Sequence, residues 1–313
     1  MHEVQSAGSQ RPSISLTIVG GAPGAGKSSL VRQLVTRATD REVVALVDHV
    51  PADAGASAAR WIVAADDGAD ALAALAERER RPDQVIVECS SSADLRRALG
   101  YGYMPGYRLD GTIVVTDPLG VQAADDGVAG EWQLHKHASV ADVVVLNKID
   151  CVDERVAQAA QRTVERIAPL ARVIWSEHGR VSPPLLLGPS EPAEPLDGEV
   201  TVAPWNVDFA PAHSRRDRGG RGRSGSRAQL NESHRTWCLI ADEPIEARTF
   251  RRWLQAVPRG IVSGGGVVHL TDAMQHRHTF HFLGRRWRLE REQPWGNDTP
   301  RTRVWLVGAG DVE

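Results

Sequence analysis

One short stretch of the chain, GGAPGAGKSSL from Gly20 to Leu30, has the residue types and spacing needed to hold phosphate. It contains the complete pattern G-x-x-x-x-G-K-[ST], and an apolar run precedes it. Glycines let backbone N–H groups converge on phosphate oxygens, while Lys27 is suited to β- and γ-phosphate oxygens and the Ser28 hydroxyl to Mg²⁺. The sequence therefore predicts a nucleoside triphosphate site formed by Gly21, Gly24, Ala25, Gly26, Lys27, Ser28 and Ser29.

A second motif, Asn147-Lys148-Ile149-Asp150, follows the apolar run ADVVVL and predicts which base is bound. An aspartate can accept hydrogen bonds from guanine N1 and N2, a pair of donors that adenine lacks. Asn147 is suited to contact guanine N7, and the stem of Lys148 can cover the ring. We therefore predict GTP rather than ATP, which also disfavours an ATP-dependent small-molecule kinase. Ser176, after the next apolar run, is a weaker candidate for a base contact.

Carboxylates at the ends of other apolar runs are candidates for metal binding and hydrolysis. Glu88 ends QVIVE, where it can hold Mg²⁺ through water or orient the attacking water. Asp117 ends the next run and is a second metal candidate, with the capping of a turn as its alternative. Asp48 and His49 close the second run, where a switch segment would begin. The predicted catalytic residues are Lys27 and Glu88, and the predicted Mg²⁺ ligands are Ser28, Glu88 and Asp117.

These candidate residues can act together only if the fold brings them to one edge of a β-sheet. Apolar runs alternate with helical segments such as 27–39 and 70–81, the runs being 14–19, 42–48, 84–89, 111–117, 141–147 and 171–175. Continuously apolar strands alternating with helices are typical of a parallel sheet covered on both faces. The predicted fold class is α/β, a doubly wound, mostly parallel sheet of the P-loop GTPase type, followed by a small C-terminal α+β domain.

A change in composition divides the chain into regions. Residues after 188 are rich in proline and acid, and SRRDRGGRGRSGSR (214–227) is rich in arginine and glycine. We predict a flexible tail at 1–13, a nucleotide-binding domain at 14–188, a linker at 189–232 and a C-terminal domain at 233–313. The arginine-rich segment lacks aromatic residues, so a solvated linker is favoured over contact with RNA or an acidic protein.

Composition excludes several classes of protein. The 313 residues carry a formal net charge of −3, which gives no overall attraction to nucleic acid or membrane. Three separated cysteines do not form a disulfide framework and fit a reducing compartment. No apolar stretch approaches the length of a membrane span, and the first residues have no apolar signal segment. We therefore expect a cytoplasmic protein that does not contact membrane.

Taken in order, the phosphate loop, the Glu88 strand end, ADVVVLNKID and the small C-terminal region resemble the CobW-type GTPases over about residues 14–310. HASVADVVVLNKID resembles that family's Q-x-x-x-A-D-h-h-h-h-N-K-x-D, with His137 in place of glutamine. RGIVSGGGVVHLTD and RTRVWLVGAG resemble its C-terminal domain. The resemblance implies slow hydrolysis of GTP to GDP and phosphate, coupled to delivery of a divalent metal, as in cobalamin biosynthesis or metal homeostasis.

Three departures from the family pattern bear on metal transfer. The family's C-x-C-C motif lies between the second strand and the Glu-containing strand, and this chain has no cysteine in that interval, 51–83. The family's Asn-Glu switch pair is replaced in this chain by Asp48-His49. Its Glu-x-x-Gly is replaced by Glu88-Cys89-Ser90-Ser91, which lacks the glycine whose N–H could sense the γ-phosphate.

Histidines offer few replacement ligands. His276 and His278 would share one face of a strand and His281 the other, and His135 and His137 form a similar pair. Ordinary packed or exposed histidines are the favoured interpretation for both groups. Cys89 is a candidate ligand or reactive thiol beside Glu88, but a buried structural cysteine is favoured.

Two functional hypotheses follow. The first is a GTPase with Mg²⁺ that delivers Zn²⁺ or Co²⁺ to a client metalloprotein, with a homodimer left open. The second is a GTP-controlled switch without metal transfer, whose C-terminal domain and arginine-rich linker contact a protein or RNA. The missing cysteines favour the second hypothesis and the overall resemblance favours the first.

Overall fold

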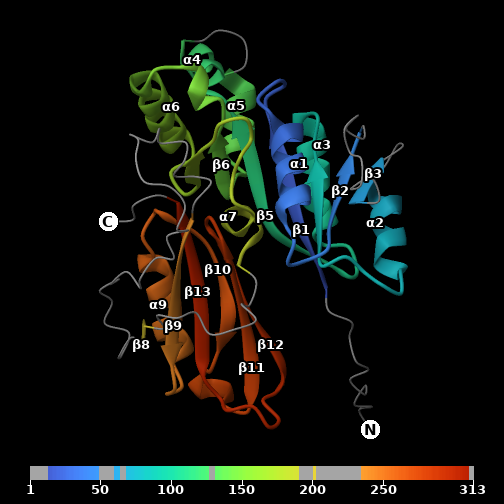
Figure 1. The fold of residues 1–313 in the computed structure, drawn as a ribbon, viewed down its shortest axis with the longest axis vertical. Coiled ribbons are helices and arrows are strands. Elements are labelled where there is room, and N and C mark those ends of the chain that lie inside the picture. The colour runs from blue at the N-terminus through green and yellow to red at the C-terminus, as the bar shows by residue number, and fades with distance from the viewer. Residues whose placement is uncertain are drawn as a thin grey trace, which may run out of the picture.

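Two β-sheets, one parallel and one antiparallel, organise the protein (Figure 1). The computed structural model describes residues 13–48, 60–63, 68–126, 131–189, 200–201 and 234–309. The first sheet has the order β3-β2-β4-β1-β5-β6-β7, and all its neighbouring strands are parallel. Its strands are β1 Ile14–Gly21, β2 Val43–Val47, β3 Trp61–Val63, β4 Gln84–Glu88, β5 Tyr107–Thr116, β6 Val143–Leu146 and β7 Arg172–Trp175. This sheet confirms the predicted doubly wound class.

Helices cover both faces of the parallel sheet. They are α1 Lys27–Arg37, α2 Gly68–Glu77, α3 Ser92–Tyr101, α4 Pro118–Asp125, α5 Glu131–Ala138, α6 Glu154–Ile167 and α7 Pro183–Leu187, with a 3₁₀ turn η2 at Ile149–Cys151. Apolar side chains of α1 and α7 form one core with one face of the strands. Helices α2 to α6 form two further cores on the opposite face. This two-sided cover explains the continuously apolar strands.

Two helices end earlier than the sequence predicts. The first stops at Arg37 instead of residue 39, because Ala38 already has an extended backbone with ψ 96°. The second runs from Gly68 to Glu77 instead of 70–81. Beyond Ala76 the sequence ERERR offers no apolar side chain to bury before Pro82. In the part of the chain that the structure covers, no helix has the length and apolarity to span a bilayer.

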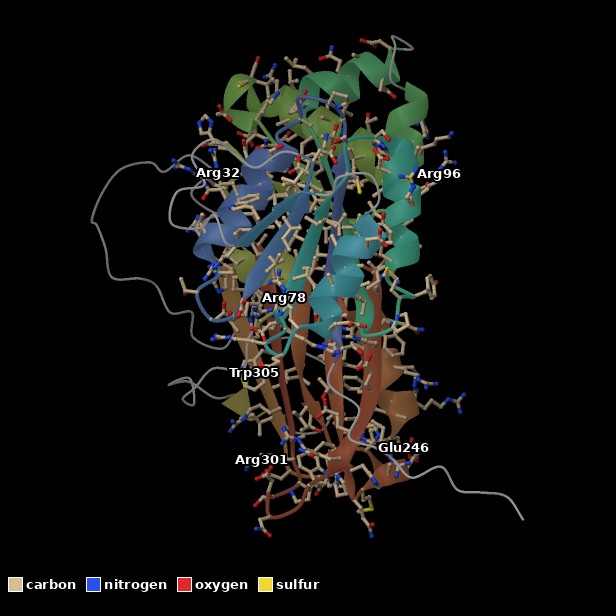
Figure 2. The ribbon with its side chains drawn as sticks, turned by 90° about the vertical axis from the view of Figure 1, so that its right-hand side faces the viewer. Arg32, Arg78, Arg96, Glu246, Arg301 and Trp305 are labelled. Atoms are coloured by element: carbon tan, nitrogen blue, oxygen red, sulfur yellow. The ribbon has the colours of Figure 1, made fainter. Side chains whose placement is uncertain are left out.

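The C-terminal region forms the second sheet, with the order β12-β11-β10-β13-β9-β8. Its elements are β8 Val200–Thr201, β9 His234–Ala241, α9 Ala247–Ala256, β10 Ile261–Val268, η3 Thr271–Ala273, β11 His276–Leu283, β12 Arg286–Pro294 and β13 Thr302–Ala309. The helix α9 packs on one face through Phe250, whose ring meets Phe280 edge-on with centroids 5.1 Å apart. Strand β8 falls within the predicted linker and pairs with β9. Figure 2 places Glu246 and Arg301 in the half of the molecule remote from the parallel sheet.

Buried charges join the two sheets where β5 and β6 begin. Asp142, only 1% exposed, pairs with Arg285 and Arg286 from the β11–β12 turn at 3.1 Å each. Asp110 is the extra residue of a bulge in β5, because Leu109 and Gly111 pair with consecutive residues of β1. The bulge accounts for the buried aspartate within β5.

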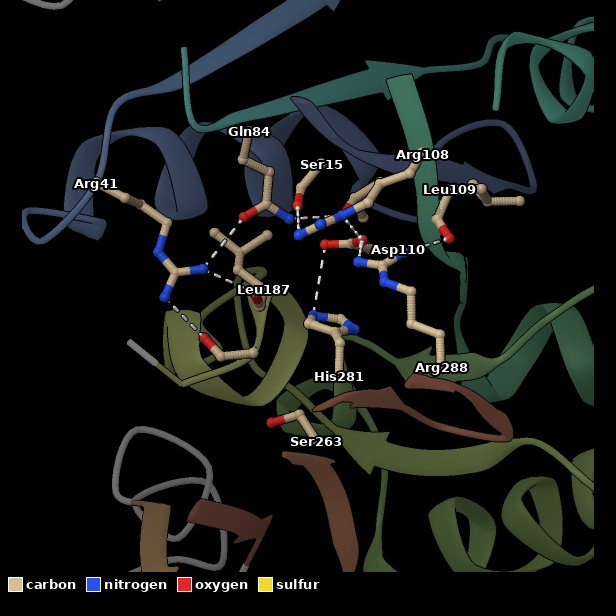
Figure 3. A network of polar contacts seen from close by, with 12 residues as sticks. Ser15, Arg41, Gln84, Arg108, Leu109, Asp110, Leu187, Ser263, His281 and Arg288 are labelled. Atoms are coloured by element: carbon tan, nitrogen blue, oxygen red, sulfur yellow. Dashed lines mark hydrogen bonds and ion pairs between the residues drawn. The ribbon is translucent and has the colours of Figure 1, made fainter. Parts of the chain in front are cut away.

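Asp110 lies at the centre of a polar network between the sheets (Figure 3). It is 2% exposed, and its carboxylate contacts Arg288, lies 3.7 Å from Arg108 Nε and 3.4 Å from His281 Nε2. Burial raises the pKa of Asp110, but His281, Arg288 and Arg108 outweigh this and hold the pKa below its usual value. The C-terminal sheet is therefore fixed by paired, buried charges at the end of β5 opposite Thr116.

We expect His281 to make stability depend on pH. Burial lowers the pKa of His281 to about 4, against the opposing charge of Asp110. Between about pH 6.5 and pH 4 the unfolded histidine binds a proton that the folded one refuses, so stability should fall as pH falls. In urea unfolding, the free energy of unfolding lost between pH 6.5 and pH 4 should be smaller for His281→Gln than for the wild type by on the order of 1–3 kcal/mol. His276→Gln on the same strand is the control, and an equal flattening there would contradict the assignment.

Candidate guanine-nucleotide site

The phosphate loop joins β1 to α1 and depends on backbone that only glycine readily adopts. Gly26, immediately before α1, has φ 101° and ψ 25°. A Cβ at Gly26 would lie 2.3 Å from Asn147 Nδ2, so a side chain is excluded by space as well as by conformation. The loop and the N-terminus of α1 thereby leave room and backbone donors for an anion.

Lys27 folds back over this loop. Its Nζ donates to Gly21 O at 3.2 Å and to Ala22 O at 3.0 Å, and the residue is 9% exposed. Burial lowers the pKa of Lys27, while the charge of Glu88 opposes this shift. An ammonium has three donors, so two contacts leave one for a phosphate oxygen.

Ser28 and Glu88 lie together, as their predicted metal role requires. Ser28 Oγ donates to Glu88 Oε1 at 2.6 Å across the ends of α1 and β4. Burial raises the pKa of Glu88, and the bond from Ser28 and the charge of Lys27 partly offset it. Hydroxyl and carboxylate oxygens are the hard ligands that Mg²⁺ prefers, so this pair fits the ion.

The loop after Glu88 is anchored by residues that depart from the family pattern. Ser90 Oγ donates to Asp48 at the end of β2. Ser91 caps α3 and exchanges reciprocal bonds with Asp94, forming a capping box. Asp48 and Ser91 are the substituted positions, and Ser90, at a variable position of the pattern, links Asp48 to this loop. His49, the other predicted switch residue, lies outside the described residues.

Asn147 braces the loops of the site. Its Nδ2 donates to Ala25 O at 2.8 Å, its Oδ1 accepts from Gly179 N at 2.9 Å, and it is 2% exposed. The predicted contact with guanine N7 has only the second N–H of Nδ2 available to it. Sequence reasoning missed this bracing role, because the motif does not reveal that Asn147 reaches the phosphate loop.

We expect Asn147→Ala to weaken both the fold and the site. Removing the amide leaves Ala25 O and Gly179 N without their partner, at about 1–3 kcal/mol for each buried group. Urea unfolding should show a loss of about 2–4 kcal/mol. Gln158→Ala, which removes an exposed bond to Glu154, should change stability little. Equal losses in the two variants would contradict the bracing role.

Asp117 lies beside Lys148 of the base-recognition motif. Asp117 is the N-cap of α4, accepting from Gly120 N at 2.9 Å, and its carboxylate lies 3.7 Å from Lys148 Nζ. These contacts favour the capping alternative over the predicted Mg²⁺ role. Lys148 itself has a left-handed backbone, with φ 58°, and stands before the turn that carries Asp150.

Ser176 is fully buried, which counts against a side-chain contact with the base. Its Oγ donates to Arg180 O at 3.3 Å, and its carbonyl accepts from Ile149 N at 3.3 Å. It therefore supports the loop between β7 and α7. His178 is an exposed residue of that loop, and its Nε2 lies 3.7 Å from Asp150 Oδ2. Sequence reasoning missed His178, although the following glycine signals a turn.

The replacement metal candidates are dispersed. His281 belongs to the Asp110 network, whereas His278 is 7% exposed on the other face of β11. His137 is also buried, at 4%. Burial raises the pKa of Cys89 to about 12, so this thiol is inert at neutral pH. Among the described residues no three His, Cys, Asp or Glu side chains form a group that could hold a metal.

Comparisons with known proteins agree with this architecture. Residues 62–175 match the family described as CobW/HypB/UreG, nucleotide-binding domain, and residues 234–312 match the cobalamin synthesis protein cobW C-terminal domain. A zinc chaperone CobW from Sinorhizobium sp. is 26% identical over 220 residues, which are 56% of this chain and 62% of the relative. Zinc-regulated GTPase metalloprotein activator 1 from Schizosaccharomyces pombe is 24% identical over 196 residues, 54% of this chain and 47% of the relative.

The chain thus matches less than two thirds of the length of either relative. Among solved structures, that of the Zn(II)-bound YjiA GTPase from E. coli is similar over 96% of this chain and 95% of that one, with 17% identity and a TM-score of 0.41. The two family matches together cover more than half of the chain, one on each sheet. The chain therefore contains a nucleotide-binding domain of the CobW/HypB/UreG family followed by a CobW C-terminal domain.

Proposed function

We propose that this protein binds GTP with Mg²⁺, hydrolyses it slowly to GDP and phosphate, and uses that cycle to deliver a divalent metal to a client protein. The observation that carries the proposal is convergence at one edge of the parallel sheet. There Asn147, after β6, is hydrogen-bonded to the phosphate loop after β1, and the loop's Ser28 is hydrogen-bonded to Glu88 at the end of β4. The carboxyl edge of such a sheet is where doubly wound folds bind ligands.

Each residue has a role in this proposal. Lys27 neutralises charge on the transferred phosphoryl group, and Ser28 holds Mg²⁺, which supplies further charge neutralisation. Glu88 positions water, either on the metal or for attack. Lys148 and Asp150 recognise guanine, with Asn147 fixing the two loops relative to each other.

The proposed cargo is Zn²⁺ or Co²⁺, and the names of the two relatives, a zinc chaperone and a zinc-regulated activator, support Zn²⁺. We further propose the domain division given above, at 14–188 and 233–313, and a cytoplasmic site of action. The partner is a client metalloprotein, with a homodimer as a further assembly.

The second candidate is a GTP-controlled interaction switch without metal transfer. The observation favouring it is the absence of cysteine from residues 51–83, where family members carry their C-x-C-C motif. Thiolates bind Zn²⁺ and Co²⁺ far more tightly than carboxylates at the same positions would. The C-terminal sheet would then contact a protein or, through the arginine-rich linker, RNA.

Calorimetric titration separates the two candidates. Zn²⁺ and Co²⁺ are titrated into the full chain, first with GDP and then with a non-hydrolysable GTP analogue. Binding that changes with the γ-phosphate is the expected result for metal delivery. If neither metal bound in either nucleotide state, metal delivery would be rejected and the interaction switch would be the remaining candidate.

We expect Asp150→Ala to weaken GDP and GTP binding by about tenfold to a hundredfold. The change removes an ionised acceptor, and a hydrogen bond to a charged group contributes about 1.5–3 kcal/mol. ATP affinity should not rise, because nothing is gained that adenine could use. Competition of both nucleotides against a fluorescent GDP analogue measures this. Unchanged guanine affinity would show that another group reads the base.

A further inference from the structure

A rigid loop holds His178 over the base-recognition residues. Gly179 N donates to Asn147 Oδ1, and Arg180 N donates to Glu177 O at 2.9 Å. A Cβ on Gly179 would lie 2.7 Å from Leu30 N, so this loop is wedged directly against the start of α1. His178 itself has φ 53°, a left-handed conformation that aims its side chain out of the turn. The loop therefore positions one side chain and fixes it there.

That side chain lies against the carboxylate that the proposed function assigns to guanine. His178 Nε2 is 3.7 Å from Asp150 Oδ2, with the His178 side chain 69% exposed and that of Asp150 26% exposed. A cation at this distance attracts the carboxylate that guanine N1 and N2 would need. Guanine and a protonated imidazole therefore compete for the Asp150 carboxylate, where His178 approaches Oδ2.

We propose that His178 is an access residue of the base site, which holds Asp150 when the site is empty and gives way to guanine. This rests on the proposed recognition of guanine by Asp150. The contact is an ion pair only when the imidazole of His178 is protonated. The competition should consequently weaken guanine binding more at low pH than at high pH.

Other charged groups lie near the His178–Asp150 pair, and their effect on binding must be distinguished from that of His178. Cys151 Sγ donates to Asp150 at 3.4 Å, and Lys148 is paired with Asp117. Glu177 and Arg180 flank His178 on its own loop. These groups are the same in the wild type and in variants at position 178, so a difference between those proteins reports on position 178. The phosphates of GDP also titrate here, but equally for every variant.

Substitutions that fix the charge at position 178 test the proposal. His178→Asn is neutral at every pH and tolerates a left-handed backbone, and His178→Lys is charged at every pH. GDP binding to the full chain is measured by calorimetry at pH 5.5 and pH 8.0. An exposed ion pair contributes about 0.2–1 kcal/mol. The ratio of Kd at pH 5.5 to Kd at pH 8.0 should therefore be up to about fivefold larger for the wild type than for His178→Asn.

The two variants bracket the wild type. His178→Lys should bind GDP more weakly than His178→Asn at both pH values. Equal pH ratios in wild type and His178→Asn would overturn the proposal. So would an equal loss of affinity in both variants at both pH values, because His178 would then be a contact to bound guanine. His276→Gln, remote on β11, should keep the wild-type ratio. If the wild type bound ADP as tightly as GDP, the proposed recognition of guanine would be wrong, whatever the role of His178.

Discussion

Replacing Lys27 by alanine should abolish nearly all GTP hydrolysis, lowering kcat by about 10²- to 10³-fold, which is typical for loss of one donor that stabilises transition-state charge. Lys27 is suited to this role because its ammonium is already held at the loop by Gly21 O and Ala22 O. Burial lowers the pKa of Lys27, but the neighbouring Glu88 favours the charged form. The Lys27 side chain is therefore already held where phosphate would arrive.

The measurement is phosphate release under single-turnover conditions, with GDP binding followed separately. Arg37→Ala is the matched control, because it removes an exposed cation from the last turn of the same helix. Ten residues along a helix place it about 15 Å away. Its kcat should stay within twofold of the wild type. A Lys27→Ala protein that released phosphate at the wild-type rate would show that the loop does not act on the γ-phosphate.

The sequence was most informative where a strand ends in a motif. Glycine spacing around Lys27 predicts a phosphate loop because backbone conformation and steric space both restrict those positions, and Gly26 has the left-handed φ that this requires. Continuous apolar runs predict a parallel sheet because both of its faces are covered, and all seven strands of that sheet are parallel. In each case the local pattern and the tertiary requirement coincide.

Contacts between distant loops were beyond the sequence. Nothing in N-K-x-D shows that Asn147 bridges Ala25 and Gly179, since those partners are 122 and 32 residues away. Similarly, the sequence leaves Asp117 open between a metal ligand and a turn cap, and only the folded chain shows its contacts with Gly120 and Lys148. Side chains whose role depends on which loop faces them need the folded chain.

The buried charges between the two sheets were likewise not predictable from the sequence. Asp110 lies within β5 but immediately before the run 111–117 that the sequence predicts as a strand, so the sequence pattern gives it no role. The structure shows that a bulge turns it toward the C-terminal sheet, where Arg288 and His281 meet it. Three strands of the parallel sheet, β1, β4 and β5, run from this interface to the nucleotide edge. The interface and the nucleotide site therefore occupy opposite ends of the same strands.

Asp110→Ala should destabilise the protein by about 3–5 kcal/mol, the usual loss when one partner of a buried charge pair is removed. The variant would leave Arg288, Arg108 and His281 facing an emptied pocket. Glu290 still pairs with both arginines, at 3.2 Å from Arg108 and 3.3 Å from Arg288, so the loss should lie toward the lower end. Because this network joins the two sheets, the C-terminal sheet should detach before the parallel sheet unfolds.

Urea unfolding followed by tryptophan fluorescence measures the effect, since Trp237, Trp253 and Trp305 are buried in the C-terminal domain. Asp242→Ala is the control: it breaks an exposed pair with Arg301 at 2.8 Å, in the half of the molecule remote from the parallel sheet (Figure 2). That loss should stay below about 1 kcal/mol. Asp110→Ala should also keep its GDP affinity in the absence of urea, because the network lies at the opposite end of the strands from the nucleotide. Equal destabilisation by the two variants would mean that the buried network does not hold the domains together.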